Sequence, residues 1–309
     1  MSEQVIEELL NKLKSASLAI GGTEITLDCN DLDDYHIEKA QRELRETPEL
    51  VQESFKILGD LLGDEENLFI PLDQKFLQRF LRRCKWYPRS TFKLIQRFYE
   101  YQKNHPEFFD NLLPSNERAI FTSEILTPLP LRTSDGLRIF VIQAGRKWNP
   151  KEVSLNQIFR GVILNLIVAI SEPKTQVSGV RVILDMEGLT LTHVTYFTPS
   201  FASAIIEFVQ KCLPCRLKGV HIINQSFIFD MVFAFFKPFL HGKLRDRIYF
   251  HGDNKASLLS YIDSKVLPKK FGGDFDLPEE SFGELFYQHA AHFEDYFIDY
   301  NRYGYVSEI

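Results

Sequence analysis

The stretch that decides the fold is residues 224–247, which read NQSFIFDMVFAFFKPFLHGKLRDR. Between residues 227 and 240 nearly every side chain is apolar, and six of these fourteen residues are phenylalanine. Six apolar residues have the i, i+3, i+4 spacing of a helix: Phe227, Ile228, Met231, Val232, Phe235 and Phe236. Pro238 is expected to end this helix. Such a helix, running into a basic strip, can face a core, an apolar ligand or a membrane. From periodicity alone, a buried core helix is the favoured interpretation.

Composition bounds the class of protein. The chain has 309 residues, of which 44% are hydrophobic, and it contains 27 phenylalanines. This is enough for one large domain or two ordinary ones with an aromatic-rich interior, and it disfavours extensive disorder. Four cysteines without any zinc-site spacing suit a reducing cytosol. The start, MSEQVIEELLNKLK, lacks the pattern of a signal peptide, and no apolar run reaches the ~20 residues of a membrane span.

The charge is unevenly distributed. The net charge of -6 argues against a general nucleic-acid binder. Residues 211–247, however, contain only two acids, Asp230 and Asp246, against seven cations: Lys211, Arg216, Lys218, Lys237, Lys243, Arg245 and Arg247. A local basic patch on an acidic protein predicts a specific anionic partner, such as phospholipid headgroups.

The order of periodic segments predicts an α/β protein in four parts. We expect an N-terminal arm over residues 1–30, with an amphipathic helix in its first 20 residues, and a helical domain over 31–115. An α/β domain with a mixed or parallel sheet follows over 116–275, and a helix and tail over 276–309. The predicted strands are 137–143, 180–184, 219–223 and 247–251, and the predicted helices between and after them include 155–170, 199–213 and 258–262.

Two motifs with catalytic spacing are better explained structurally. Cys212 and Cys215 have redox CxxC spacing, but they close an apolar helix instead of opening one, so coincidence is the favoured interpretation. Asp185 and Glu187 follow a strand and directly precede Gly188, which favours a turn over acid/base work. The histidines are scattered, without a nucleophile elbow, P-loop or dinucleotide fingerprint. We therefore expect no enzymatic activity, no cofactor and no metal.

What remains is a surplus of apolar side chains beside positive charge, which predicts a pocket for a lipophilic ligand. We expect its walls to come from the predicted helices and strands and from the phenylalanine-rich helix. The candidate pocket residues are Phe159, Ile163, Leu166, Leu184, Ile205, Phe208, Val209, Val220, Ile222, Phe227, Met231, Val232 and Phe235.

Five motifs, in this order and spacing, resemble those of a known family. They are LQRFLRRCKWYPRSTFKLIQRF (77–98), ILDMEGLTLTHV (183–194), LPCRLKGVHIIN (213–224), FKPFLHGKLRDRIYFHG (236–252) and LPKKFGG (267–273). They are similar to the CRAL-TRIO lipid-binding proteins, in the subgroup of the α-tocopherol transfer protein, the cellular retinaldehyde-binding protein and the clavesins. The resemblance covers roughly residues 40–275.

The resemblance implies a fold and a mechanism. It implies an N-terminal helical domain followed by an α/β domain with a mixed or parallel sheet and a deep apolar cavity, which residues 227–236 close as a lid helix. It also implies a phosphoinositide cleft beside the lid, at Arg216, Lys218, Lys243 and Arg247. Leu184 stands where the retinaldehyde binder has a buried Glu, and Leu189 where the tocopherol binder has Trp, which disfavours both of those ligands.

The predicted function is a cytoplasmic, non-enzymatic carrier, peripheral on membranes. It would bind one tocopherol, retinoid, carotenoid or other isoprenoid and exchange it at phosphoinositide-containing membranes. The alternative is a lipid-regulated adaptor in membrane trafficking that binds phosphoinositide and a protein partner without net lipid transfer. A carrier moves ligand between vesicles, and an adaptor does not.

Overall fold

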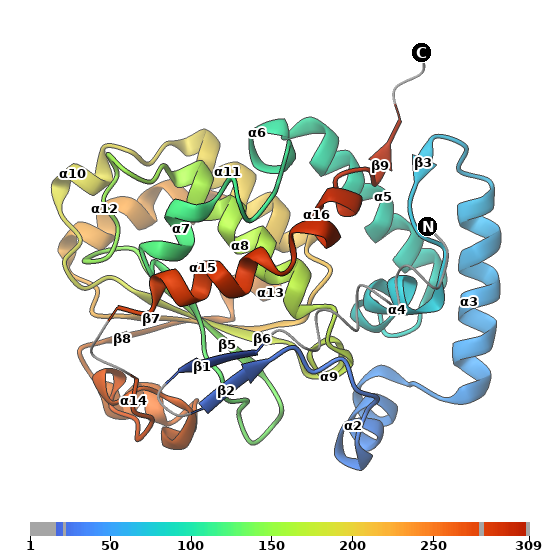
Figure 1. Cartoon of the computed structure of the whole chain (residues 1–309), viewed down its shortest axis with the longest axis horizontal. Coiled ribbons are helices and arrows are strands. Elements are labelled where there is room, and N and C mark those ends of the chain that lie inside the picture. Colours follow the sequence, from blue (N-terminus) through green and yellow to red (C-terminus); the bar gives the residue numbers. More distant parts are fainter. Residues whose placement is uncertain (1–16, 21–22, 278–280, 307–309) are drawn as a thin grey trace.

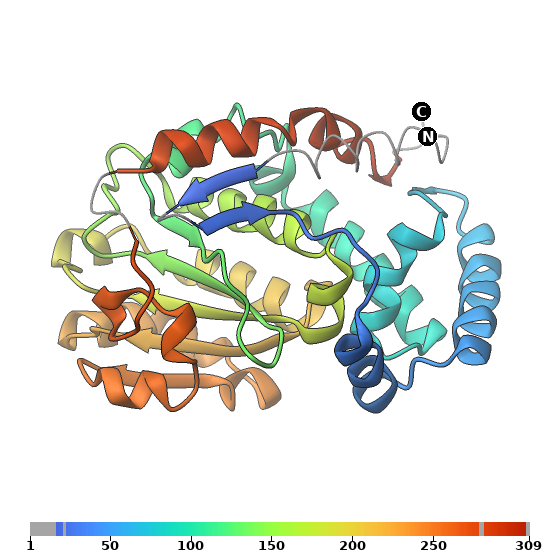
Figure 2. The same ribbon diagram turned by 60° about the horizontal axis from the view of Figure 1, so that its bottom comes forward.

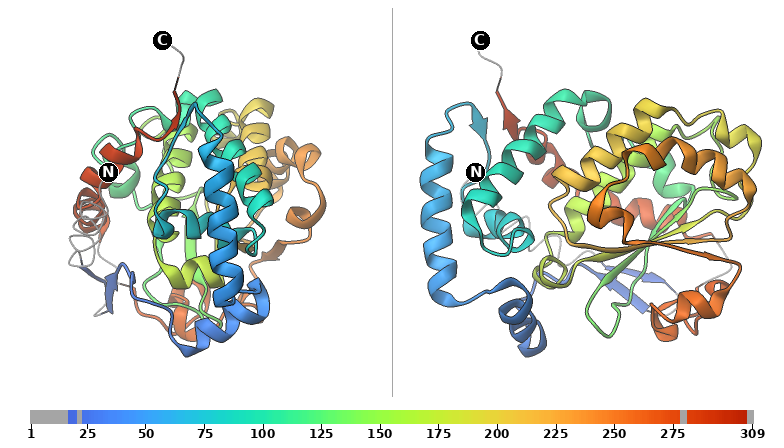
Figure 3. Two further views of the ribbon diagram at one scale, coloured as in Figure 1. Left: turned by 90° about the vertical axis from the view of Figure 1, so that its right-hand side faces the viewer. Right: turned by 180° about the vertical axis from the view of Figure 1, so that it is seen from behind.

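The computed structural model describes residues 17–20, 23–277 and 281–306. A group of helices from the first third of the chain lies to one side of a larger α/β part (Figure 1). The helices of this group are α2 (Asp34–Leu44), α3 (Pro48–Gly63), α4 (Gln74–Arg83), α5 (Pro88–Asn104) and α6 (Pro106–Phe109). The two views in Figure 3 show α3 on the outside of this group, far from the sheet.

Side-chain caps fix where these helices begin. The Asp73 carboxylate accepts a hydrogen bond from the backbone N–H of Phe76 at 2.9 Å, as its position before α4 predicts. Thr47 caps α3 in the same way, with Pro48 in the first helical turn. These caps satisfy N–H groups that the first turn of a helix leaves without partners.

The α/β part is built on a five-stranded sheet in the order β4-β5-β6-β7-β8. The β4–β5 pair is antiparallel and the other neighbours are parallel, so of the two predicted sheet types, mixed or parallel, the mixed one is confirmed. Its strands are β4 (Leu126–Pro128), β5 (Arg138–Gln143), β6 (Val180–Asp185), β7 (Leu217–Ile223) and β8 (Ile248–Gly252). Short β4, at the edge of the sheet, was not predicted.

Helices cover one face of the sheet, and all of them except the first connect parallel strands (Figures 1 and 3). These helices are α7 (Arg118–Thr122), α8 (Leu155–Ala169), α9 (Pro173–Ser178), α10 (Leu191–Val194), α11 (Pro199–Glu207), α12 (Phe227–Phe236) and α13 (Gly242–Arg245). Helix α11 continues into a π-helical turn over Phe208–Cys212. The opposite face is covered by α14 (Lys255–Leu259) and the loop that follows it.

Side-chain alternation along the strands separates two apolar layers. Phe140 and Ile142 of β5 point toward α8, whereas Ile139 and Val141 pack with Leu258 on the α14 face. Successive side chains of a strand point to opposite faces, so strands apolar on both sides belong in a sheet covered on both sides.

The two ends of the described chain pack onto the α/β part. Strands β1 (Ser17–Ile20) and β2 (Thr23–Thr26) form a hairpin beside α15 (Gly283–Ala291), as Figure 2 shows. The helix predicted for the first 20 residues is therefore wrong over 17–20, and its remainder lies outside the described residues. After α16 (Glu294–Tyr300), strand β9 (Gly304–Tyr305) pairs with β3 (Leu68–Phe69), which ties the C-terminal segment to the helical group. Within the described ranges, no helix is long and apolar enough to cross a membrane.

Candidate functional site

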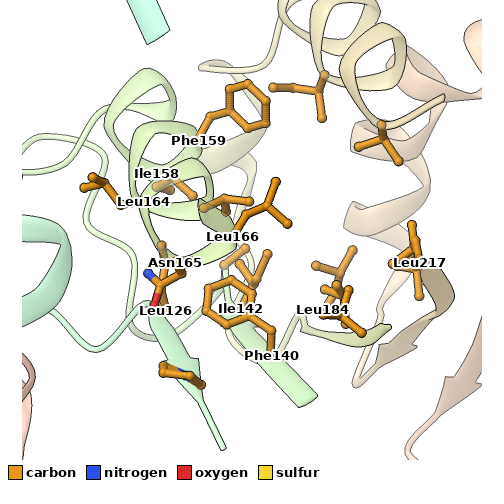
Figure 4. A pocket seen from close by; sticks show the side chains of 18 of the residues that line it. Leu126, Phe140, Ile142, Ile158, Phe159, Leu164, Asn165, Leu166, Leu184 and Leu217 are labelled. Carbon is orange, nitrogen blue, oxygen red and sulfur yellow. The ribbon is translucent and has the colours of Figure 1, made fainter. Parts of the chain in front are cut away.

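An apolar cavity of about 430 Å³ lies between the sheet and its helical layer. This volume is within the range of small-molecule sites, ~300–1,000 Å³. Figure 4 shows Phe140, Ile142 and Leu184 on the sheet side and Ile158, Phe159 and Leu166 on α8, all turned into one space.

Helix α12 closes the cavity with one of its faces. The side chains that line the cavity from this helix are spaced i, i+3, i+4 and i+7: Phe229, Val232, Phe233 and Phe236. Phe229 and Val232 are only 3% and 5% exposed. The Ser226 hydroxyl caps the helix by accepting a hydrogen bond from the backbone N–H of Ile228 at 3.3 Å. This helix therefore begins with a serine cap.

The structure places nine of the thirteen predicted pocket residues on the cavity wall. They are Phe159, Leu166, Leu184, Ile205, Phe208, Val209, Val220, Ile222 and Val232.

The other four do not line it in the described structure, and their placement corrects the prediction. Ile163 is buried in the core on another face of α8, and Phe235 is half-buried on α12. Phe227 and Met231 are 73% and 45% exposed. For the three on α12 the physical reason is that this helix is apolar almost all round, so its sequence pattern does not define which side chains face inward.

The C-terminal helices also line the cavity, which the sequence analysis missed. Their contributions are Phe286, His289, Ala290, Phe293 and Phe297. Glu124, which follows α7, holds this segment in place. Its buried carboxylate accepts hydrogen bonds from the backbone N–H groups of Phe282 (2.7 Å) and Gly283 (3.1 Å) and forms an ion pair with Lys147 (2.8 Å). A polar residue of the α/β part thus caps the start of α15.

Three of the four predicted headgroup residues lie near the start of β7. Arg216 directly precedes the strand, Lys218 lies in it, and Arg247 donates to the backbone oxygen of Leu217 at 2.6 Å. Lys243 is exposed on α13 and makes no ion pair within the described part of the chain.

A carboxylate from the helical group already binds two of these cations. Glu43 of α2 lies 2.7 Å from the Arg216 guanidinium and 3.1 Å from the Lys218 ammonium. Burial raises the pKa of Glu43, but the hydrogen bonds from these two cations outweigh burial and lower its pKa to about 2. Lys39, one turn earlier on α2, is 3% exposed and donates to the backbone oxygen of Asp135. Burial lowers the Lys39 pKa, partly opposed by the negative charge of Glu43.

The geometry of the two catalytic-looking motifs agrees with their structural interpretation. Burial raises the pKa of Cys212 and of Cys215 to about 12, so both remain thiols at neutral pH. Asp185 is buried and accepts hydrogen bonds from the Asn224 side chain at 2.9 Å and from the backbone N–H of Glu187 at 3.1 Å, which fixes the turn after β6. Over the described residues, no group of three or more His, Cys, Asp or Glu has a metal-binding arrangement.

Comparison with known proteins identifies the family of this chain. Residues 122–273 match the CRAL/TRIO domain model. The human alpha-tocopherol transfer protein-like protein is 34% identical over 238 residues, which cover 77% of this chain and 69% of that protein. Clavesin-1 of Mus musculus is 31% identical over 243 residues, covering 77% of this chain and 68% of the relative. A solved structure, that of Sfh5, aligns with 83% of this chain and 92% of its own at 9% identity and a TM-score of 0.41. On the sequence matches, this chain belongs to the CRAL/TRIO family.

Proposed function

We propose that this protein is a non-enzymatic, cytoplasmic carrier. It binds one lipophilic molecule in the cavity and exchanges it at membranes that contain phosphoinositides. The observation that carries the proposal is the cavity of about 430 Å³, whose wall is almost entirely hydrocarbon and which α12 covers. An empty apolar cavity of this size lowers the stability of a fold, because the side chains around it lose packing contacts. A bound ligand restores those contacts.

The outer surface of the lid supports exchange at a membrane. Phe227, Met231 and Phe250 are exposed by 73%, 45% and 50%, although each is a large apolar side chain. The Phe250 ring contacts the Phe233 ring at a centroid distance of 5.4 Å, so exposed and cavity-facing side chains form one apolar cluster. Exposed cations follow in the chain at Lys237 and then in α13. Apolar side chains beside cations are the features that bind an anionic membrane surface.

In the adaptor alternative, we expect the protein partner to dock on the acidic C-terminal segment. Here α15 and α16 form part of the cavity wall, and β9 pairs with β3. This segment therefore contributes to ligand enclosure, which favours the carrier over the adaptor. One matched relative is named an alpha-tocopherol transfer protein-like protein, which supports the carrier. The name clavesin states no activity, and neither name identifies the ligand of this chain.

The direct test is native mass spectrometry of the protein purified from its own source, followed by thermal unfolding with candidate lipids. A ligand that binds only the native state stabilises it by ~2.7 kcal/mol at a hundredfold excess over Kd. The carrier proposal predicts a co-purified lipid or a rise in Tm with an isoprenoid lipid. A protein that carries no lipid and whose Tm no candidate lipid changes would contradict it.

A further inference from the structure

The cavity wall contains few polar side chains, and these decide which ligand chemistry it accepts. Among the described lining residues, charged, amide or imidazole groups belong to Arg138, Asn165, Glu172 and His289. An unpaired polar group that faces an apolar space costs free energy unless a ligand group pairs with it. The hydrogen bonds of these four residues therefore indicate what a ligand must supply.

Two of the four are already paired with each other, and the third, His289, has one ring nitrogen that the protein encloses. Arg138 and Glu172 bind each other, with nitrogen–oxygen distances of 3.0 and 2.5 Å, and Arg132 also donates to Glu172 at 2.7 Å. Burial lowers the pKa of His289 to about 4, so its ring is neutral. Its Nδ1 is enclosed by protein atoms without a hydrogen-bond partner in the described structure.

Asn165 differs because only one end of its amide is paired. Its Nδ2 donates to the backbone oxygen of Gly161, one turn earlier on α8, at 2.9 Å. If the amide were flipped, Oδ1 would face the Gly161 carbonyl oxygen, and two acceptors would meet. The hydrogen bond to Gly161 therefore assigns Nδ2 as the paired atom and Oδ1 as the other end of the amide. Oδ1 accepts no hydrogen bond from the described residues, and it is not among the polar atoms enclosed by the protein. Figure 4 shows Asn165 among hydrocarbon side chains, as the one labelled side chain with nitrogen and oxygen.

We propose that Asn165 Oδ1 accepts a hydrogen bond from a hydroxyl group of the bound molecule, so that the cavity selects a lipophilic alcohol. This inference rests on the proposed carrier function and names its ligand class. Hydrocarbons, ethers, esters and aldehydes have no O–H donor and leave the amide oxygen unpaired. An ionised fatty acid has no donor either, and it brings a charge that the apolar wall disfavours.

The test compares one isoprenoid alcohol with its methyl ether. Geranylgeraniol and geranylgeranyl methyl ether differ in the hydroxyl hydrogen, which the ether replaces with a methyl group. Their affinities are measured by displacement of Nile red from the full chain. Wild type should prefer the alcohol by roughly three- to tenfold, the usual net value of a neutral hydrogen bond. Asn165→Leu should abolish that preference.

Asn156→Leu is the matched control. Asn156 lies on the same helix, is exposed, and does not line the cavity, so this variant should keep the wild-type preference. Equal affinity of wild type for both ligands, or a preference that persists in Asn165→Leu, would overturn the inference while leaving the carrier function in place. If Asn165→Leu does not fold, Asn165→Met and the wild-type comparison decide in the same way. If wild type binds neither ligand, the inference is overturned, and native mass spectrometry of the purified protein decides the carrier function separately.

Discussion

The carboxylate of Glu43 lies 2.7 Å from the guanidinium of Arg216, although the two residues are 173 positions apart in the chain. Lys218 shares the same carboxylate oxygen at 3.1 Å. Glu43 of the helical group thus forms ion pairs with Arg216 and Lys218, two of the cations that we propose bind a phosphoinositide headgroup. A headgroup that binds there must compete with Glu43.

Glu43→Gln should therefore strengthen binding to phosphoinositide vesicles. Without the Glu43 charge, about one more cationic charge is available to the headgroup. One cation near an anionic membrane contributes ~1 kcal/mol to the free energy of binding, or roughly fivefold in affinity. Vesicle co-sedimentation measures the change. Glu38→Gln is the control, because it removes an exposed negative charge from the same helix. An equal effect of both variants would show that only net charge matters.

The pH dependence of stability should reveal the same ion pair. The folded-state pKa of Glu43, about 2, is below its ordinary value of 4.5. The pair therefore stabilises the fold fully above about pH 4.5, and this contribution is lost as the pH falls toward 2. Denaturant unfolding should show wild type more stable than Glu43→Gln at pH 6, with the gap narrowing below pH 4.5. A gap that does not depend on pH would contradict this assignment.

Neighbouring residues of the lid should respond in opposite ways to an introduced charge. Val232→Asp places an unpaired carboxylate in the cavity wall and should abolish the ligand-induced rise in Tm. Met231→Asp places the same group in solvent and should leave that rise nearly intact, since Met231 is 45% exposed. Differential scanning fluorimetry with and without geranylgeraniol measures both. Loss of the rise in Met231→Asp would show that the helix binds ligand through its other face.

The contrast between these two residues shows what the lid sequence did and did not predict. The helix, its start and its breaker follow from its periodicity and from Pro238. Its inward stripe does not, because α12 offers apolar side chains in every direction. The contact of Glu43 with Arg216 and Lys218 has no local sequence signal, because it depends on how the helical group packs against β7.

The sheet was easier to predict than its edge. Strands β5 to β8 have five to seven residues each and are rich in apolar side chains, so their pattern was sufficient. Strand β4 has only three residues, including Thr127 and Pro128, and its strand conformation depends on pairing with β5. The cavity-lining role of α15 was hidden for a similar reason, since it depends on the cap that Glu124 provides over a long sequence separation.

Glu124→Ala should loosen α15 and destabilise the protein by ~1–3 kcal/mol, because two backbone N–H groups lose their acceptor. Hydrogen exchange by mass spectrometry should show faster exchange over Gly283–Ala291. Glu284→Ala provides the comparison, since Glu284 lies in the first turn of α15 but, among the residues that the structure describes, forms only an exposed ion pair with Arg118. Similar exchange in the two variants would mean that Glu124 does not hold the helix.

The double variant Cys212→Ser, Cys215→Ser should keep lipid binding and transfer. Burial raises the pKa of both thiols to about 12, so few thiolates exist at pH 7 to react. Lipid transfer after mild peroxide treatment measures their role. Loss of transfer in oxidised wild type but not in the oxidised variant would reveal a redox switch.

The central claim, exchange of a lipid at phosphoinositide membranes, is tested most directly by a fluorescence transfer assay between vesicles. The variant is Lys218→Ala with Lys243→Ala, because these lysines do not line the cavity and donate no hydrogen bond to the backbone within the described chain. Phosphoinositide in the acceptor vesicles should accelerate transfer by wild type. The variant should keep its ligand affinity in solution and bind those vesicles one to two orders of magnitude more weakly, so its acceleration is lost. Equal transfer rates for wild type and variant, with and without phosphoinositide and at two salt concentrations, would contradict the account.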